Sequence, residues 1–218
     1  MVSSSIASNM NLDGLTPTQI AISDSPDELA LQLKRFADEK LIIVPRGGGT
    51  MMELGAPLAR ADVALSLEKF TRILDYQPEN LTVRVQAGAT WDALSAELAK
   101  HGQRVPLDPP LPAQATVGGI LAANVSGALR VRYGSARDLV IGVQIAMTNG
   151  QLLKGGGQVV KNVAGYDLPK LFIGSLGTLG IITEATFLSC RLVPIGMLAP
   201  SCESIASRLW TVNGVCVV

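Results

Sequence analysis

The sequence predicts an α+β protein in which a small α/β part is followed by a hairpin-rich α+β part. Helix-like and strand-like segments alternate as far as residue 105, which is typical of α/β units. From residue 106 the chain is rich in proline and small residues, and two apolar runs then meet at Asn149 and Gly150, a strong β-hairpin signal. Because 48% of the 218 residues are hydrophobic and no low-complexity linker divides them, we expect one compact unit.

The first expected helix begins after Ser25, which is placed as its N-cap. Pro26 occupies the first helical position and Glu28 completes a capping box. Four apolar residues share one face of this helix: Leu29, Leu33, Phe36 and Ala37. A buried strand is expected at 41–44, because its residues are mostly β-branched and a helix of four residues would be marginal. Pro45 should end this strand, since it cannot donate to a ladder.

Three consecutive glycines at 47–49 follow this strand. Glycine reaches backbone conformations closed to other residues and leaves its N–H donor accessible, so the loop could bind an anion. A plain turn explains the same residues about equally well. The loop lacks the Gly-Lys-Ser/Thr ending of a nucleotide triphosphate loop, and Met52 stands where a dinucleotide fingerprint starting at Gly47 needs its third glycine. If this loop binds a phosphate, it does so in a fold other than these two nucleotide-binding types.

The remaining elements follow from the same signals. A strand is expected at 81–88 and a second helix at 90–102, with Trp91, Leu94 and Leu98 facing inward. Two strands within 137–154 should form the hairpin. A short helix capped by Asp167 and ended by Gly174 should precede a closing strand at 179–193.

Composition argues against several classes of partner. Lys plus Arg and Asp plus Glu both number 18, so no strong field favours nucleic acid. The uncharged stretch 110–129 holds two prolines and three glycines, which makes it a poor membrane span, so no transmembrane segment is expected. The first residues lack a basic start and an apolar run, so a secretory signal is not supported and a cytoplasmic location is expected.

Cysteine and histidine give no clear catalytic or metal site. Cys190, Cys202 and Cys216 are odd in number and widely spaced, so we interpret them as reduced structural thiols and expect no metal. His101, the only histidine, lies where the second helix should end at Gly102. A cationic side chain is favoured there, so a structural role is preferred to a catalytic one and the catalytic base stays unknown.

Two further segments repeat the small-residue pattern of the glycine loop. TVGGILAANVSG at 116–127 and GSLGTLGIIT at 174–183 could let a backbone approach a large flat ligand, or could serve tight packing. Three separate glycine-rich loops are less easily explained as plain turns or tight packing than a single loop would be.

Six segments together resemble the FAD-binding fold shared by vanillyl-alcohol oxidase and para-cresol methylhydroxylase. They are PRGGGT (45–50), LDPP (107–110), ATVGGILAANVSG (115–127), RYGSARDLV (132–140), VVKNVAGYDLPKL (159–171) and GSLGTLGIITEATF (174–187). The resemblance implies a PCMH-type FAD-binding domain over residues 20–195, after an N-terminal tail at 1–19. Residues 196–218 would then be the start of a truncated cap domain or a C-terminal extension.

The resemblance also implies a set of FAD-binding residues. It assigns the diphosphate to the loop at 46–50, a second wall to 116–127, and the adenine end to the strand start at 180–182. The implied residues are Arg46, Gly47, Gly48, Gly49, Thr50, Pro109, Pro110, Thr116, Val117, Gly118, Gly119, Ala122, Ala123, Gly127, Tyr133, Gly134, Gly180, Ile181 and Ile182. Neither the loop at 45–50 nor the segment at 116–127 contains or adjoins a histidine or cysteine that could attach the flavin covalently, so noncovalent FAD is expected.

Within this family the segment KNVAGYDL is most similar to the FAD-binding subunit of glycolate oxidase. That resemblance implies an FAD-dependent oxidoreductase subunit that acts on CH–OH donors beside a catalytic flavoprotein subunit and an iron–sulfur subunit. Its partners could hold it at the periphery of the inner membrane, and alone it should be inactive. Two alternatives stay open: a subunit for D-lactate or another 2-hydroxy acid, and a shortened non-catalytic paralogue that binds FAD or only a partner.

Overall fold

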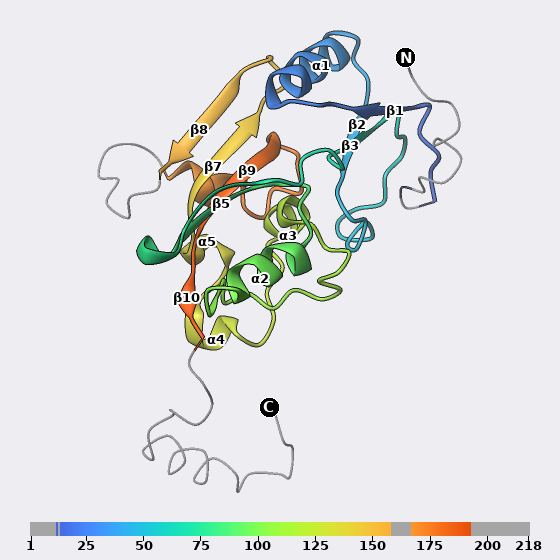
Figure 1. Cartoon of the computed structure of the whole chain (residues 1–218). Coiled ribbons are helices and arrows are strands. Elements are labelled where there is room, and N and C mark those ends of the chain that lie inside the picture. The colour runs from blue at the N-terminus through green and yellow to red at the C-terminus, as the bar shows by residue number, and fades with distance from the viewer. Residues whose placement is uncertain (1–11, 13, 158–166, 193–218) are drawn as a thin grey trace, which may run out of the picture.

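The computed structural model describes residues 12, 14–157 and 167–192, which form two main sheets with helices packed around them (Figure 1). The smaller sheet is parallel, with strand order β1-β3-β2. Its strands are β1 (Gln19–Ile22), β2 (Ile43–Arg46) and β3 (Val63–Ser66). The larger sheet is antiparallel, with order β4-β5-β9-β7-β8. Its strands are β4 (Ile73–Gln77), β5 (Thr82–Gln86), β7 (Val140–Ala146), β8 (Leu152–Gly156) and β9 (Ile181–Leu188).

The shorter elements surround these sheets (Figure 1). A two-stranded ribbon pairs β6 (Gln103–Arg104) with β10 (Cys190–Arg191). The helices are α1 (Pro26–Asp38), α2 (Trp91–Ala99), α3 (Val117–Ala123), α4 (Arg130–Tyr133), α5 (Ala136–Leu139) and α6 (Leu168–Phe172), with a 3₁₀ turn η2 (Pro78–Asn80). This arrangement confirms the α+β class. Within the described residues, no helix is long and apolar enough to cross a membrane.

The boundary between the two parts differs from the prediction. The parallel sheet ends at β3, and both β4 and β5 belong to the antiparallel sheet, so the α/β part does not extend to residue 105. The apolar face of β5 carries Val83 and Val85, which lie opposite Phe187 and Ala185 of β9. A pairing between strands about a hundred residues apart leaves no periodic trace in the sequence, so alternation alone could not reveal it.

The first helix and strand were predicted with small errors. Ser25 accepts a hydrogen bond from the N–H of Glu28 at 3.2 Å, but the Glu28 carboxylate accepts from the N–H of Asp24 at 2.8 Å rather than from that of Ser25. The expected strand at 41–44 lies at 43–46, so the prediction that Pro45 ends it is wrong. Because β2 is an edge strand, it tolerates a residue without an N–H donor.

The later elements largely match the prediction. The second helix is capped by Thr90, buries Trp91, Leu94 and Leu98, and ends before Gly102, which has φ +63°. The hairpin is present, and the N–H of Gly150 donates to the Met147 carbonyl at 3.0 Å. Its first strand begins at 140 rather than 137, because residues 136–139 form α5.

The end of the described chain also follows the prediction. Asp167 caps α6 and accepts from the N–H of Lys170, and Gly174 follows the helix with φ +86°. The closing strand is divided at Ser189 into β9 and β10. Most of the KNVAGYDL segment lies outside the described residues.

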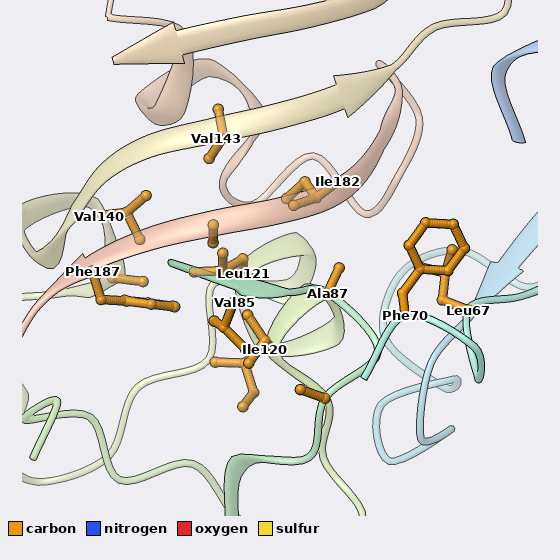
Figure 2. Packing of buried hydrophobic residues seen from close by; sticks show 14 of the residues in the cluster. Leu67, Phe70, Val85, Ala87, Ile120, Leu121, Val140, Val143, Ile182 and Phe187 are labelled. Carbon is orange, nitrogen blue, oxygen red and sulfur yellow. The ribbon is translucent and has the colours of Figure 1, made fainter. Parts of the chain in front are cut away.

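The main core lies between α3 and the larger sheet (Figure 2). It continues to Leu67 and Phe70, which follow β3 in the chain. Ile120 and Leu121 of α3 are buried to 98% or more together with Val85 and Phe187 of the sheet. Trp91 of α2 meets the Phe187 ring edge to face, with 5.9 Å between the ring centres. This packing fixes the position of α3 and of the loops on either side of it.

Candidate FAD site

A cavity of about 400 Å³ lies where the two main sheets meet. Its volume is in the range usual for small-molecule sites. Residues 44–58 form one wall, the start of α3 a second, and residues 175–182 a third. The cavity brings together most of the residues that the sequence pointed to: Arg46, Gly47, Gly48, Gly49, Thr50, Thr116, Gly118, Gly119, Ala122, Ala123, Gly180, Ile181 and Ile182.

The glycine loop supplies the free hydrogen-bond donors of this cavity. Among the described residues, no acceptor lies against the backbone N–H groups of 47–50, although all four residues line the cavity. These residues are half-buried, and a row of backbone donors without a protein acceptor beside a cavity is suited to an anion. The loop turns at Gly49, which has φ +72°.

Arg46 adds the positive charge of the site. It is the only charged residue among the described residues that line the cavity, and no carboxylate in the described part of the chain pairs with it. Its Nε is buried without a hydrogen-bond acceptor. A side-chain carbon added at Gly49 would lie 2.8 Å from a terminal guanidinium nitrogen, so the charge stands directly beside the loop.

Two of the three glycines are also required for packing, which the sequence did not reveal. A side chain on Gly47 would overlap the Thr116 hydroxyl, and one on Gly48 would overlap the Gln114 carbonyl. These glycines therefore have a packing role in addition to the access to N–H donors that the sequence suggested. They let the first wall of the cavity rest directly on the segment that leads into the second.

The second wall offers surface rather than donors. The N–H of Val117 donates to the Ala89 carbonyl at 2.9 Å, and that of Gly118 to the Ala87 carbonyl at 2.7 Å. The N–H of Gly119 donates to the Thr116 hydroxyl at 3.3 Å. With these donors already used, the start of α3 can contribute a flat, small-residue surface made by its glycines and alanines.

The third wall is tied to the other two. The N–H of Leu176 donates to the Ala122 carbonyl at 2.9 Å. Gly177 has φ +77°, and a side chain there would come within 2.7 Å of the Pro45 ring. The Ser175 hydroxyl oxygen on this wall is buried and has no hydrogen-bond partner within the described residues.

Sequence reasoning missed part of the lining. The missed residues are Val44, Pro45, Met51, Met52, Leu54, Gly55, Ala56, Leu58, Leu67, Ser175, Leu176, Gly177 and Thr178. The segment GSLGTLG carried a usable signal for 175–178, because its glycines were recognised while only its end was assigned to the site. The apolar residues at 51–58 carry no comparable signal.

Six of the predicted residues lie outside the cavity lining. Pro109 and Pro110 border a small hollow beside it that also touches Thr50 and Gly119. Val117 is fully buried in the core, and Gly127 packs against Asp108. Tyr133 and Gly134 lie at the end of α4. A role in FAD binding stays a prediction for all six.

The cavity contains no evident acid or base. Among its described lining residues there is no histidine, aspartate or glutamate. His101 is exposed just beyond α2, and its ring contacts that of Tyr76 edge to face, with 5.2 Å between the ring centres. Where the chain is described, no group of histidine, cysteine or carboxylate side chains could hold a metal ion.

Free N–H donors, one unpaired guanidinium and extended apolar walls suit a ligand with linked phosphates and flat rings. FAD has these properties, so the residues present fit it.

Comparisons with known proteins agree with this chemistry. Residues 17–156 match the family described as FAD binding domain. The chain is 38% identical over 179 residues to glycolate oxidase subunit GlcD of Bacillus subtilis, covering 82% of this chain and 37% of that protein. It is 37% identical over 170 residues to mitochondrial D-lactate dehydrogenase (cytochrome) of Arabidopsis thaliana, covering 78% of this chain and 30% of that protein.

A solved structure of alkyldihydroxyacetonephosphate synthase shares the fold with a TM-score of 0.69 and 26% identity. The match covers 81% of this chain and 32% of that structure. This chain thus spans about a third of the length of the relatives it matches.

Proposed function

Since this chain belongs to the FAD-binding domain family, we propose that it is the FAD-binding subunit of an oxidoreductase acting on a 2-hydroxy acid, with glycolate as the first candidate substrate. The observation that carries the proposal is the row of unpaired N–H donors at 47–50 beside the unpaired guanidinium of Arg46. The names of two relatives, a glycolate oxidase subunit and a D-lactate dehydrogenase, support the substrate class.

In this proposal the first wall binds the phosphates. The N–H groups of 47–50 would donate to phosphate oxygens, and Arg46 would offset their charge. Hydrogen bonds to charged groups are worth about 1.5–3 kcal/mol each, so four donors and one cation would contribute substantially to binding, less the costs of association and desolvation. Gly118, Gly119 and Ile182 would lie against the flat rings, where small or apolar side chains exclude water. The cavity lining contains no histidine or cysteine among the described residues, so we expect noncovalent attachment.

The chemistry of substrate oxidation needs more than this cavity provides. When bound, FAD supplies a two-electron acceptor for conversion of an alcohol to a carbonyl group. That reaction also needs a base within hydrogen-bond reach of the substrate and a cation for its carboxylate. Because the described lining holds no titratable base, we propose that a catalytic flavoprotein subunit and an iron–sulfur subunit complete the enzyme. Through them the chain would be cytoplasmic and peripheral to the inner membrane.

Two further functions are favoured by single observations. The D-lactate dehydrogenase relative favours D-lactate, or another 2-hydroxy acid, in place of glycolate. The lack of an acid or base in the described lining favours a non-catalytic module that only binds FAD or a partner.

Cofactor binding is tested by titrating the purified chain with FAD and following quenching of flavin fluorescence. We expect saturation at one FAD per chain, and Arg46→Gln should weaken binding. Arg72→Gln is the matched control, because Arg72 is exposed, outside the cavity and free of ion pairs within the described residues. No uptake of FAD, or equal weakening by the two substitutions, would refute the assigned site.

The catalytic part is tested by anaerobic mixing of the FAD-loaded chain with glycolate or D-lactate while flavin absorbance is recorded. We expect no prompt bleaching by either acid when the chain is alone. Bleaching should appear when the products of neighbouring genes are added, and the more effective acid identifies the substrate. Prompt bleaching of the isolated chain would show that it holds its own catalytic site.

A further inference from the structure

Two arginines that are far apart in sequence share one tyrosine ring outside the cavity. The guanidinium carbon of Arg104 in β6 lies 5.6 Å from the centre of the Tyr133 ring. That of Arg132 in α4 lies 5.4 Å from the same centre. Cation–π attraction of this kind holds both groups in place, but it does not neutralise their charges.

No carboxylate in the described part of the chain forms an ion pair with either arginine. The acids nearby in sequence are engaged elsewhere. Asp108 accepts from the N–H of Leu129 at 3.2 Å, and Asp138 accepts from the N–H of Ser135 at 2.8 Å. Two guanidinium charges near one ring add to the local positive potential, so an anion beside either group would be stabilised.

Arg104 shows most clearly that a hydrogen-bond donor of this pair lacks an acceptor. Its Nε is buried and has no hydrogen-bond acceptor. Partial burial disfavours its charged form, while contacts with Tyr133 and with Cys190 raise its pKa overall, so the group stays protonated. A buried donor of a charged group without a partner costs free energy that a bound acceptor would recover.

We propose that Arg104 and Arg132, held by Tyr133, form a binding site for an oxyanion of the carboxylate or phosphate class. Guanidinium groups bind such anions through paired N–H donors, and weakly hydrated arginine suits a partly buried position better than lysine does. Among the described residues none of these three lines the cavity, so the two arginines would bind their anion outside it, while FAD contact by Tyr133 stays a prediction from the sequence.

The test is a titration of the FAD-loaded chain with inorganic phosphate and, in a second arm, with succinate. The ¹⁵N–¹H signals of the arginine Nε groups report each side chain separately. We expect saturable shifts for Arg104 and Arg132 in the millimolar range, with smaller shifts at high salt because exposed charges are screened. Arg60, already bonded to Asp62 at 2.8 Å, should not move. Whichever anion saturates at the lower concentration, phosphate or succinate, identifies the class of oxyanion that the site prefers.

Substitutions complete the test. Arg104→Gln and Arg132→Gln should each weaken phosphate binding about tenfold, since each removes a charge-assisted contact. Arg130→Gln is the matched control on the same helical turn, and it should change affinity less than about twofold because, within the described residues, the Arg130 guanidinium makes no cation–π contact with Tyr133. FAD affinity should be unchanged in all three variants.

The outcomes separate this site from the proposed function. Shifts that are absent, or equal for all arginines, would overturn the oxyanion site even if FAD binds normally. If the unmodified chain does not bind FAD, the FAD site is refuted, and the same anion titration on the FAD-free chain still tests this site. Because the titration uses the unmodified chain, a variant that fails to fold does not remove the test.

Discussion

Gly48→Ala should lower the stability of the folded protein as well as its affinity for FAD. The added carbon would overlap the Gln114 carbonyl oxygen and lie 2.7 Å from its carbonyl carbon, whereas ordinary contact begins near 3.4 Å. The opposing segment cannot retreat easily. Ala115 donates to the Leu111 carbonyl at 2.8 Å and accepts from the N–H of Trp91 at 2.9 Å, which fixes it to the start of α2.

Overpacking in a well-packed region costs about 1–3 kcal/mol. Because the clash is with fixed backbone, we expect the upper end, about 3 kcal/mol, which is about a hundredfold in the unfolding equilibrium. The assay is urea denaturation of the FAD-free chain. A second titration of the folded variant with FAD should show weaker binding, since the loop must move away from its position.

Two glycines serve as controls for this experiment. Gly157→Ala meets nothing within 4 Å and has no positive φ, so it should be neutral. Gly102→Ala also meets nothing, but its φ of +63° makes alanine strained by about 1 kcal/mol. If Gly48→Ala unfolds at the same urea concentration as the unmodified chain and only FAD binding suffers, the packing argument is wrong and ligand access alone explains the glycine.

Three other outcomes are expected. Acid precipitation of the FAD-loaded chain should release all flavin into the supernatant, and flavin retained in the pellet would contradict noncovalent binding. Arg46→Gln should raise the FAD dissociation constant about tenfold to a hundredfold, as loss of a charge-assisted contact implies; a change below twofold would remove Arg46 from the site. Asp138→Asn should lower the melting temperature at neutral pH, because hydrogen bonds from the Ser135 backbone and side chain hold the pKa of Asp138 below its ordinary value. Its contribution is complete above the unfolded-state pKa and disappears as pH falls through the lower folded pKa, so a difference that persists in strong acid would refute this cause.

Local signals were enough to predict the local elements. Ser25 and Pro26 mark the start of α1, and Asn149 with Gly150 marks the hairpin, because capping and turn preferences depend only on neighbouring residues. The error at Pro45 has a topological cause. A proline looks like the end of a strand unless one knows that β2 lies at a sheet edge.

Most of the residues that the motifs pointed to line one cavity, whereas the contacts that hold its walls together could not be predicted. The glycine segments indicated where a ligand could approach, and the cavity brings three of them together. Gly48 packs against the Gln114 carbonyl, and the first N–H groups of α3 donate to the Ala87 and Ala89 carbonyls. These contacts join segments that are distant in sequence, so local patterns do not reveal them. The same holds for Arg104 and Arg132, which are 28 positions apart by their numbers and meet only through Tyr133.

The strand order of the larger sheet sets a limit on when the molecule can fold during synthesis. β9 lies at its centre, between β5 and β7, yet it is the last of the five strands to be made. Until residue 188 has left the ribosome, β4–β5 and β7–β8 are two separate hairpins with open edges, which are prone to wrong pairing. The same segment brings Gly180, Ile181 and Ile182 to the cavity, so a nascent chain cannot form the complete cavity any earlier. If this cavity binds FAD as we propose, the cofactor can stabilise the protein only after the sheet has closed.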